Sequence, residues 1–295
     1  MEKIIVIVGP TAVGKTKISI ELAKKINGEI INGDAMQVYQ GLDVITAKIK
    51  PFEMEGIPHH LFSFLPIKEN YSVADYQKNL RNKIKEVQNR KKVPIIVGGT
   101  GLYIKAALYD YQFNEQEDTH QEIQEKYKNY TNQELYDYLK NIDVESALIL
   151  HPNNRRRVLR AIEIYEQNGQ TKSEMLKQQE HKLLYPCCFI GLTMDTELLN
   201  QRINQRVEEM FLDNVVEEIQ NNPTTSTASK AIGYQQIKDY IQHKISLDEC
   251  KEQIKLRTRQ YRKRQMTWLK HQFNVTWFDV NHNSLEDIYN YYIGD

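Results

Sequence analysis

Residues 4–16 read IIVIV-GPTAVGKT and end in the GxxxxGKT pattern of a phosphate-binding loop. The five apolar residues predict a short buried strand, and a helical pattern follows from Lys17 to Ile26. A loop of this kind directs several backbone N–H groups and the positive end of a helix at one anion. Lys15 adds a full charge, and the Thr16 hydroxyl is suited to a magnesium ion. The stretch therefore predicts a nucleotide-binding type of loop that holds a diphosphate or triphosphate, in preference to a glycine turn without a ligand.

The composition limits the class of protein. The 295 residues suffice for one large or two modest domains, and 39 basic residues balance 39 acidic ones. A nucleic-acid site therefore depends on local clusters of charge. The three cysteines include the adjacent pair Cys187 and Cys188 and fit reduced thiols better than a disulfide framework. Since we find neither a signal peptide nor a long apolar run, we expect a cytoplasmic protein that does not enter a membrane.

Strands alternate with helical patterns over the first hundred residues. Strands are predicted at Ile4–Val8, Glu29–Asn32 and Val93–Val97, and a helix capped by Ser72 at Tyr71–Gln88. This alternation predicts an α/β fold, a P-loop NTPase-like parallel sheet with helices on both faces. Ligands of such sheets bind at the carboxyl ends of the strands. The phosphate loop, Asp34 and the turn Gly98–Gly101 all fall at that edge.

The middle of the chain has a different character. From residue 111 onwards polar residues and tyrosines dominate, and Leu135, Tyr138, Leu139 and Ile142 fit one face of a helix. The later segments are predicted as a strand at Cys188–Thr193, helices at Thr196–Asn221 and Leu247–Gln272, a strand at Val275–Val280 and a short closing helix. We therefore predict a catalytic core formed by residues 1–110 and 186–295, interrupted by a helical insertion at 111–185. The alternative for the insertion is a solvated cover with no role.

Asp34 is the carboxylate best placed for chemistry, since it follows the second strand beside the phosphate loop. Three interpretations of Asp34 remain open from its position alone. It organises a magnesium ion, acts as a general base, or caps the next turn.

Two basic clusters stand out in a chain of zero net charge. The first comprises Arg155–Arg157 and Arg160, and the second runs from Lys255 to Lys270 without an acidic residue. Tyr261 and Trp268 are interleaved with the second cluster, which suits contact with a nucleic-acid backbone together with base stacking. The alternative in both places is a solvated helix face.

A pair of arginines and the histidines complete the candidate residues. Arg202 and Arg206 share a helix face, from which they reach a diphosphate or pair with Glu208 or Glu209. The histidines and cysteines lack the spacing of zinc ligands, and no nucleophile triad is evident. The residues alone thus indicate a phosphate-handling α/β enzyme with a basic accessory surface.

Nine motif blocks in order extend this interpretation. They are GPTAVGKT (9–16), DAMQVYQGLDV (34–44) with Thr46-Ala47-Lys48, PHHL (58–61), YSVADY (71–76), GGTGLY (98–103), HPNNRRR (151–157) with Arg160, RINQRV (202–207), AIGY (231–234) and TRQYRKRQMTW (258–268). Along nearly its whole length the chain resembles the bacterial tRNA dimethylallyltransferases, also called tRNA isopentenyltransferases.

The resemblance implies a prenyl transfer. A dimethylallyl group would pass from dimethylallyl diphosphate to N6 of the adenosine immediately 3′ of the anticodon, with Mg²⁺ as cofactor. By the family pattern Asp34 is the general base, Thr11 contacts the bridging oxygen, and Arg206 adds positive charge. The diphosphate-binding residues implied are Gly9, Pro10, Thr11, Ala12, Val13, Gly14, Lys15 and Thr16, with Thr16 on the metal. The tRNA-binding residues implied are Asp34, Ala35, Met36, Gln37, Thr100, Arg156, Arg157, Val158, Leu159 and Arg160.

The implied partners are the tRNA anticodon stem-loop, gripped by the insertion, and dimethylallyl diphosphate, and we expect a monomer. The chain departs from the family pattern at several positions. Ala35 replaces a common serine, Ile45 a glycine, Asn154 an aspartate, and Asn214-Val215 a Gly-Leu pair. Three alternatives are kept, namely a P-loop small-molecule or nucleoside kinase, an adenylate isopentenyltransferase that modifies a free nucleotide, and a non-catalytic RNA-binding module.

Overall fold

The computed structural model describes residues 3–113, 120–178 and 180–294. The chain divides into two compact units, a core of Met1–Tyr109 with Leu183–Asp295 and an inserted unit of Asp110–Lys182. The inserted unit begins one residue earlier and ends three residues earlier than the predicted 111–185. Tyr109 and Leu183 form one antiparallel bridge, so the chain leaves and re-enters the core at the same place.

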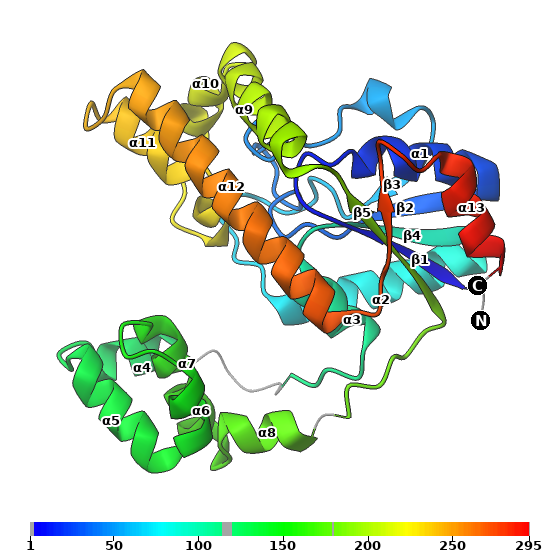
Figure 1. Ribbon diagram of the computed structural model, residues 1–295. Coiled ribbons are helices and arrows are strands. Elements are labelled where there is room, and N and C mark those ends of the chain that lie inside the picture. The colour runs from blue at the N-terminus through cyan, green and yellow to red at the C-terminus, as the bar shows by residue number, and fades with distance from the viewer. Residues whose placement is uncertain (1–2, 114–119, 179, 295) are drawn as a thin grey trace. The chain divides into compact units, whose positions relative to one another are not determined.

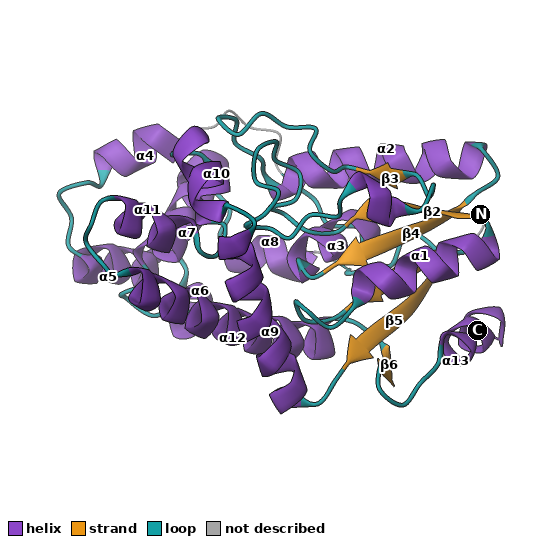
Figure 2. Cartoon of the chain, turned by 90° about the horizontal axis from the view of Figure 1, so that it is seen from above, coloured by secondary structure: helices purple, strands orange, loops and turns teal. Residues whose placement is uncertain are grey.

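The core is built on a six-stranded sheet in the order β3-β2-β4-β1-β5-β6, and every neighbouring pair is parallel. The strands are β1 (Ile4–Val8), β2 (Gly28–Asn32), β3 (His59–His60), β4 (Val93–Gly98), β5 (Cys187–Thr193) and β6 (Thr276–Asp279). In Figure 2 the arrowheads of β4 and β5 point to the same side of the sheet, where the loops gather. The predicted α/β fold with a parallel sheet is confirmed.

Both faces of the sheet are covered, as the side chains of β1 demonstrate. Ile4, Val6 and Val8 join one hydrophobic cluster, whereas Ile5 and Ile7 join another. All five side chains are fully buried, which stabilises the fold by about 1.5–3 kcal/mol for each such residue. The alternation of side chains along a strand thus explains why an unbroken apolar run needs helices on both sides.

Figure 1 shows α1 and α13 on one face of the sheet and α2 and α3 on the other. The core helices are α1 (Lys15–Ile26), α2 (Val73–Asn89), α3 (Gly101–Leu108), α9 (Thr196–Leu212), α10 (Val215–Asn221), α11 (Tyr234–Ile241), α12 (Leu247–Gln272) and α13 (Leu285–Gly294), with 3₁₀ turns at Pro51–Met54 and Thr227–Lys230. Ser72 caps α2 as predicted, and its hydroxyl accepts the Asp75 N–H. None of the helices in the described parts of the chain is long and apolar enough to cross a membrane.

One predicted helix is wrong. The continuous helix expected over Thr196–Asn221 is broken into α9 and α10, because Asn214 adopts a left-handed conformation with φ of 60°. Asparagine tolerates this conformation better than most residues, so the break needs no glycine. Strand β3 and helix α11 were not predicted, since two residues and eight residues give little periodic signal.

The inserted unit is entirely helical among its described residues. Its helices are α4 (His120–Lys126), α5 (Asn132–Ile142), α6 (Val144–Ile149), α7 (Arg155–Asn168) and α8 (Lys172–Gln178). Leu135 and Leu139 of the predicted amphipathic face are fully buried in a separate hydrophobic cluster, with Tyr138 and Ile142 packed against it. The unit thus has a small core of its own.

Candidate active site

The phosphate loop connects the buried end of β1 to the start of α1. Gly14 occupies the N-cap position of α1 with φ of 102°, a conformation that favours glycine, and no side chain caps the helix. The first N–H groups of α1 therefore have no side-chain acceptor and form an anion-binding helix end.

Lys15 lies inside this loop. Its ammonium Nζ donates hydrogen bonds to the carbonyl oxygens of Gly9 at 3.0 Å and Pro10 at 2.8 Å. Burial lowers the pKa of Lys15 to about 8; the negative charge of Asp34 opposes this shift and the positive charge of Arg206 adds to it. An anion placed in the loop would hold Lys15 in its charged form.

Arg206 of α9 reaches the loop directly. Its Nη1 donates a hydrogen bond of 3.0 Å to the Thr11 hydroxyl oxygen. Burial lowers the pKa of Arg206, and the charges of Asp34 and Glu209 oppose that shift. Arg202 is more exposed, but its Nη1 lies 3.9 Å from where a Cβ on Gly14 would stand. Both arginines thus face the phosphate loop, and Arg206 is the one that contacts Thr11.

The loop after β2 holds Asp34 in a fixed turn. The Asp34 Oδ1 accepts the Met36 N–H at 2.9 Å, and the Asn32 Oδ1 accepts the Asp34 N–H at 2.8 Å. The fully buried Asn32 also donates through Nδ2 to the carbonyl oxygens of Asp34 and Leu61. Asp34 therefore caps a turn, one of its three interpretations, and this use of Oδ1 does not engage Oδ2.

Thr100 lies in the turn between β4 and α3, the third loop of the site after the phosphate loop and the loop of Asp34. It is the N-cap residue of α3, and its hydroxyl oxygen accepts the Ala35 N–H at 3.0 Å. The negative charge of Asp34 also helps to raise the pKa of Tyr261 to about 12, chiefly an effect of burial. The carboxyl ends of β1, β2 and β4 thus meet around Asp34, as the sequence predicts.

Side-chain hydrogen bonds to backbone carbonyls hold the segment that follows Asp34. The Gln37 Nε2 donates to the Thr46 carbonyl oxygen at 3.0 Å, and Lys48 donates from a buried position to the Tyr39 carbonyl at 2.6 Å. Ala35 is buried, whereas Met36 and Gln37 are partly exposed. These contacts fix the conformation of residues 34–37, which the family resemblance implies to contact the tRNA.

Sequence reasoning missed Gln265 of α12. This buried glutamine accepts the Thr11 N–H and donates to the Gly99 carbonyl oxygen, each at 3.1 Å. The sequence signal that could have identified Gln265 is its position four residues after Tyr261, which places both side chains on one face of the predicted helix.

Some basic side chains of α12 pair within the core, and others are exposed. Lys255 pairs with Glu208 and Glu252, and Arg259 donates to the Asn204 side chain at 2.7 Å. The exposed cations that remain are Arg257, Lys263, Arg264 and Lys270. Trp268, for which base stacking was predicted, is partly buried and packs against the hydrophobic core and Phe273. Its ring packs 2.2 Å from where a Cβ on Gly101 would stand, so much of its surface serves packing.

In the inserted unit the arginine cluster also divides. Arg155 donates to the carbonyl oxygens of Tyr127 and Tyr130, each at 2.6 Å, so it holds the unit together. Arg156, Arg157 and Arg160 are exposed. The side chains of the two implied RNA-binding residues between them, Val158 and Leu159, are buried in the core of the unit and face away from solvent.

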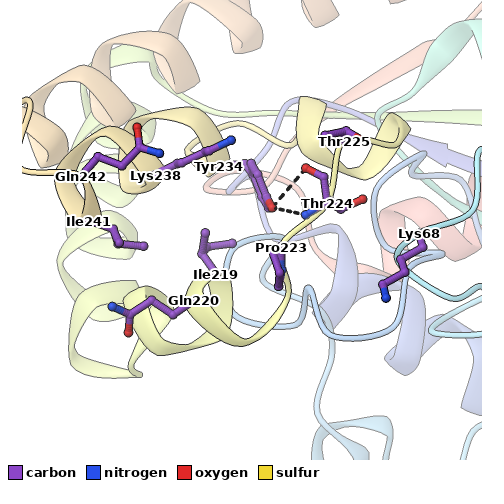
Figure 3. Close-up of a pocket in the computed structure, with 10 residues that line it drawn as sticks. All are labelled: Lys68, Ile219, Gln220, Pro223, Thr224, Thr225, Tyr234, Lys238, Ile241 and Gln242. Atoms are coloured by element: carbon purple, nitrogen blue, oxygen red, sulfur yellow. Dashed lines mark hydrogen bonds between the residues drawn. The ribbon is translucent and has the colours of Figure 1, made fainter.

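A hollow of about 590 Å³ lies elsewhere in the core, between α10 and α11 (Figure 3). The Tyr234 hydroxyl oxygen anchors its wall by accepting the Thr224 N–H at 2.8 Å and donating to the Asn222 carbonyl at 3.1 Å. None of the predicted site residues lines it. The AIGY block thus has a structural use in holding the loop between α10 and α11.

The residues around the loop fit a magnesium ion that arrives with a diphosphate. Thr16 is exposed at the first turn of α1 and offers a hard oxygen ligand. Within the described ranges, no group of three or more His, Cys, Asp or Glu side chains could hold a metal ion. Magnesium commonly takes few protein ligands when phosphate oxygens and water supply the others.

A parallel sheet with a glycine-rich loop, a partly buried lysine and two arginines at its carboxyl edge defines a P-loop enzyme that handles diphosphate groups. The comparisons narrow this class. The family profile described as IPP transferase matches residues 37–272. A tRNA dimethylallyltransferase of Anoxybacillus flavithermus is 48% identical, over 96% of this chain and 92% of the relative. The chain therefore belongs to the IPP transferase family.

Solved structures agree with this assignment. The tRNA delta(2)-isopentenylpyrophosphate transferase of Staphylococcus epidermidis has 43% identity and a TM-score of 0.73, over 100% of this chain and 99% of that one. A eukaryotic dimethylallyltransferase acting on tRNA has 31% identity and a TM-score of 0.86, over 100% of this chain and 80% of that one. The family resemblance found in the sequence is confirmed.

Proposed function

We propose that this chain is a tRNA dimethylallyltransferase whose chemistry is carried by Asp34, Thr11 and Arg206. It transfers the dimethylallyl group of dimethylallyl diphosphate to N6 of the adenosine immediately 3′ of the anticodon and releases diphosphate. The observation that carries the proposal is the Arg206–Thr11 hydrogen bond on a phosphate loop that Asp34 faces. The activity of the relatives favours tRNA as acceptor over the substrates of a kinase or a free adenylate.

The leaving group is stabilised by fixed positive charge. As the allylic C–O bond breaks, negative charge grows on the bridging oxygen and the diphosphate. Lys15 and Arg206 both contact the phosphate loop, and the N–H groups at the start of α1 have no side-chain cap, which supports binding of the diphosphate there. Preorganised donors of this kind supply a large part of many rate enhancements. Mg²⁺ bound by Thr16 and the diphosphate would supply further charge neutralisation.

Asp34 acts on the acceptor. The N6 amine is a poor nucleophile because its lone pair is delocalised into the adenine ring. As the new C–N bond forms, N6 gives up a proton, and Asp34 receives it through Oδ2 while Oδ1 keeps the turn. General-base catalysis of this kind typically contributes about 10²–10⁴-fold.

The tRNA is held by two sets of residues. The adenosine must be flipped out of the stacked loop to reach the diphosphate. We assign contacts with this adenosine to Met36, Gln37 and Thr100; the Met36 N–H bonds to Asp34 and the Thr100 hydroxyl to the Ala35 N–H, which supports the assignment. We assign the anticodon stem to the inserted unit, through Arg156, Arg157 and Arg160. The enzyme acts as a monomer in the cytoplasm, where its tRNA substrate is found.

The test is prenylation of RNA. The purified protein is incubated with Mg²⁺, labelled dimethylallyl diphosphate and an unmodified anticodon stem-loop that carries adenosine 3′ of the anticodon. We expect label in this RNA, and none in a matched RNA with guanosine at that position, which lacks the N6 amine. Absence of label with both RNAs, together with tight ATP binding, would contradict the proposal and favour the kinase.

A further inference from the structure

One uncharged polar side chain of α12 is buried between the phosphate loop, which holds Thr11, and the turn after β4, which contacts the loop of Asp34. Gln265 is only 6% exposed. Its Oε1 accepts the backbone N–H of Thr11, and its Nε2 donates to the carbonyl oxygen of Gly99, each at 3.1 Å. A single amide thus joins the phosphate loop after β1 to the turn after β4.

Glutamine is the residue type that this place requires. The two loops present one donor and one acceptor, and a primary amide offers one acceptor and one donor group at matching ends. Glutamate lacks the donor, and methionine lacks both functions while keeping the length. The fit is also steric, because a Cβ on Gly99 would lie 2.1 Å from the Gln265 Nε2. Gly99 therefore leaves the space that the amide fills.

The two joined loops lead to opposite sides of the proposed reaction. On one side, Thr11 carries the hydroxyl that Arg206 contacts, where the leaving group is expected. On the other side, Gly99 precedes Thr100, whose hydroxyl oxygen holds the Ala35 N–H next to Asp34. One hydrogen-bonded path from the leaving-group side to the general base, in addition to the pairing of β1, β4 and β2, therefore passes through Gln265.

Tyr261 supports this amide from one helical turn earlier. Hydrogen bonds with Thr100 and with Gln265 lower the pKa of Tyr261, although burial outweighs them. With its pKa raised to about 12, chiefly by burial, the Tyr261 phenol stays neutral at physiological pH. Tyr261 and Gln265 thus form one polar face of α12, and Gln265 on this face bonds to both the phosphate loop and the turn after β4.

We propose that Gln265 is a positioning residue that fixes the separation between the Thr11 hydroxyl and the Asp34 carboxylate. This inference rests on the proposed function, because it assigns Thr11 to the leaving group and Asp34 to the acceptor. Gln265 acts through its neighbours and touches neither substrate. A displacement of about 1 Å between reacting groups can cost about 10²-fold in rate, which is the effect expected from its loss.

The first experiment compares Gln265→Met with Gln253→Met in steady-state prenylation. Gln253 lies on the same helix but bonds to Glu249 within it, so it serves as the matched control. For Gln265→Met, assayed well below its Tm, we expect kcat to fall about 10²-fold with KM for both substrates close to wild type. Its Tm should fall only modestly, because the Thr11 N–H and the Gly99 carbonyl oxygen lose their partner. The control should retain wild-type kcat. An unchanged kcat in Gln265→Met, or a loss that only follows a lowered Tm, would overturn the inference.

The second experiment places Gln265→Met in an Asp34→Asn background. If Gln265 acts by placing Asp34, its replacement should cost much less once the base is gone, since residues that act together are non-additive. Full additivity would contradict positioning and indicate a general structural role. The wild-type assay keeps the two proposals distinct. Failure of wild-type protein to prenylate RNA defeats the proposed function, whereas active wild type with an indifferent Gln265→Met defeats only this inference.

A conservative variant gives a third readout. Gln265→Glu keeps the acceptor for the Thr11 N–H but has no donor for Gly99 until its carboxyl is protonated. We expect the ratio of its kcat to that of wild type to rise as pH falls, because protonation restores the missing donor. A ratio that does not change with pH would overturn the assignment of the Gly99 bond to catalysis.

Discussion

Arg206 and Thr11 are 195 residues apart in sequence, yet their side chains share a hydrogen bond of 3.0 Å. Thr11 belongs to the part of the core before the inserted unit, and Arg206 to the part after it. The phosphate site is therefore complete only when the two halves of the core have folded together. In the proposed reaction, an arginine supplied in this way would add positive charge at the leaving group, beyond what the loop itself provides.

The first prediction separates the two arginines of α9. Arg206→Ala removes the contact to Thr11, so we expect kcat for prenylation to fall by about 10²–10³-fold, as for other donors lost from a transition state. Arg202→Ala, on the same face but more exposed, should mainly raise KM for dimethylallyl diphosphate. The measurement is steady-state kinetics at saturating RNA. A larger loss of kcat in Arg202→Ala would reverse the assignment.

The second prediction concerns the general base. Asp34→Asn keeps an oxygen that can accept the Met36 N–H, so the turn and Tm should be preserved. It cannot accept the N6 proton, and we expect single-turnover prenylation to slow by about 10²–10⁴-fold with RNA affinity nearly unchanged. Near-wild-type turnover in Asp34→Asn would leave Asp34 with only its turn-capping role.

Much of this site could be predicted because it lies where short local patterns are strong. The stretch 4–16 fixes a strand, a loop and a helix in one place, and the structure begins α1 at Lys15. Parallel strands then bring Asp34 and Thr100 to the same edge through topology alone. The long helix predicted roughly at Leu247–Gln272 has these same bounds in the structure, where the Ser246 hydroxyl caps its start.

The remainder depended on contacts that no local pattern encodes. The basic run from Lys255 to Lys270 was predicted to be a surface for a polyanion, but Lys255 at its start forms an ion pair with Glu208 of α9. Gln265 gives no signal on its own, since its meaning comes from Thr11 and Gly99, each more than 160 residues away. The helix breaks at Asn214, where the family pattern has glycine. Asparagine also adopts the left-handed conformation found there, but it is a weaker sequence signal of a helix end than glycine is.

The third prediction divides the arginine cluster of the inserted unit. Arg155→Ala removes two charge-assisted hydrogen bonds to backbone carbonyls, so it should lower the free energy of unfolding by about 1–3 kcal/mol in urea denaturation. Arg156→Ala and Arg157→Ala should leave that stability unchanged. Each should instead weaken stem-loop binding and reduce the slope of log K against log salt concentration by about 1. Equal stability losses at all three positions would contradict this division.

The last prediction follows from the pKa of Lys15, which burial lowers to about 8. Below that pH the ammonium is charged and attracts the diphosphate, whereas above it the free enzyme has lost the charge. Binding of the anion favours the charged form and raises this pKa, so binding takes up a proton near pH 8 and the affinity falls as pH rises further. Calorimetry of dimethylallyl diphosphate binding in two buffers of different ionisation enthalpy measures that uptake directly. Lys15→Arg is the control, because arginine stays protonated throughout and shares any titration of the substrate itself. Equal proton uptake by wild type and Lys15→Arg would show that Lys15 is already fully charged in the free enzyme and that its burial does not weaken diphosphate binding.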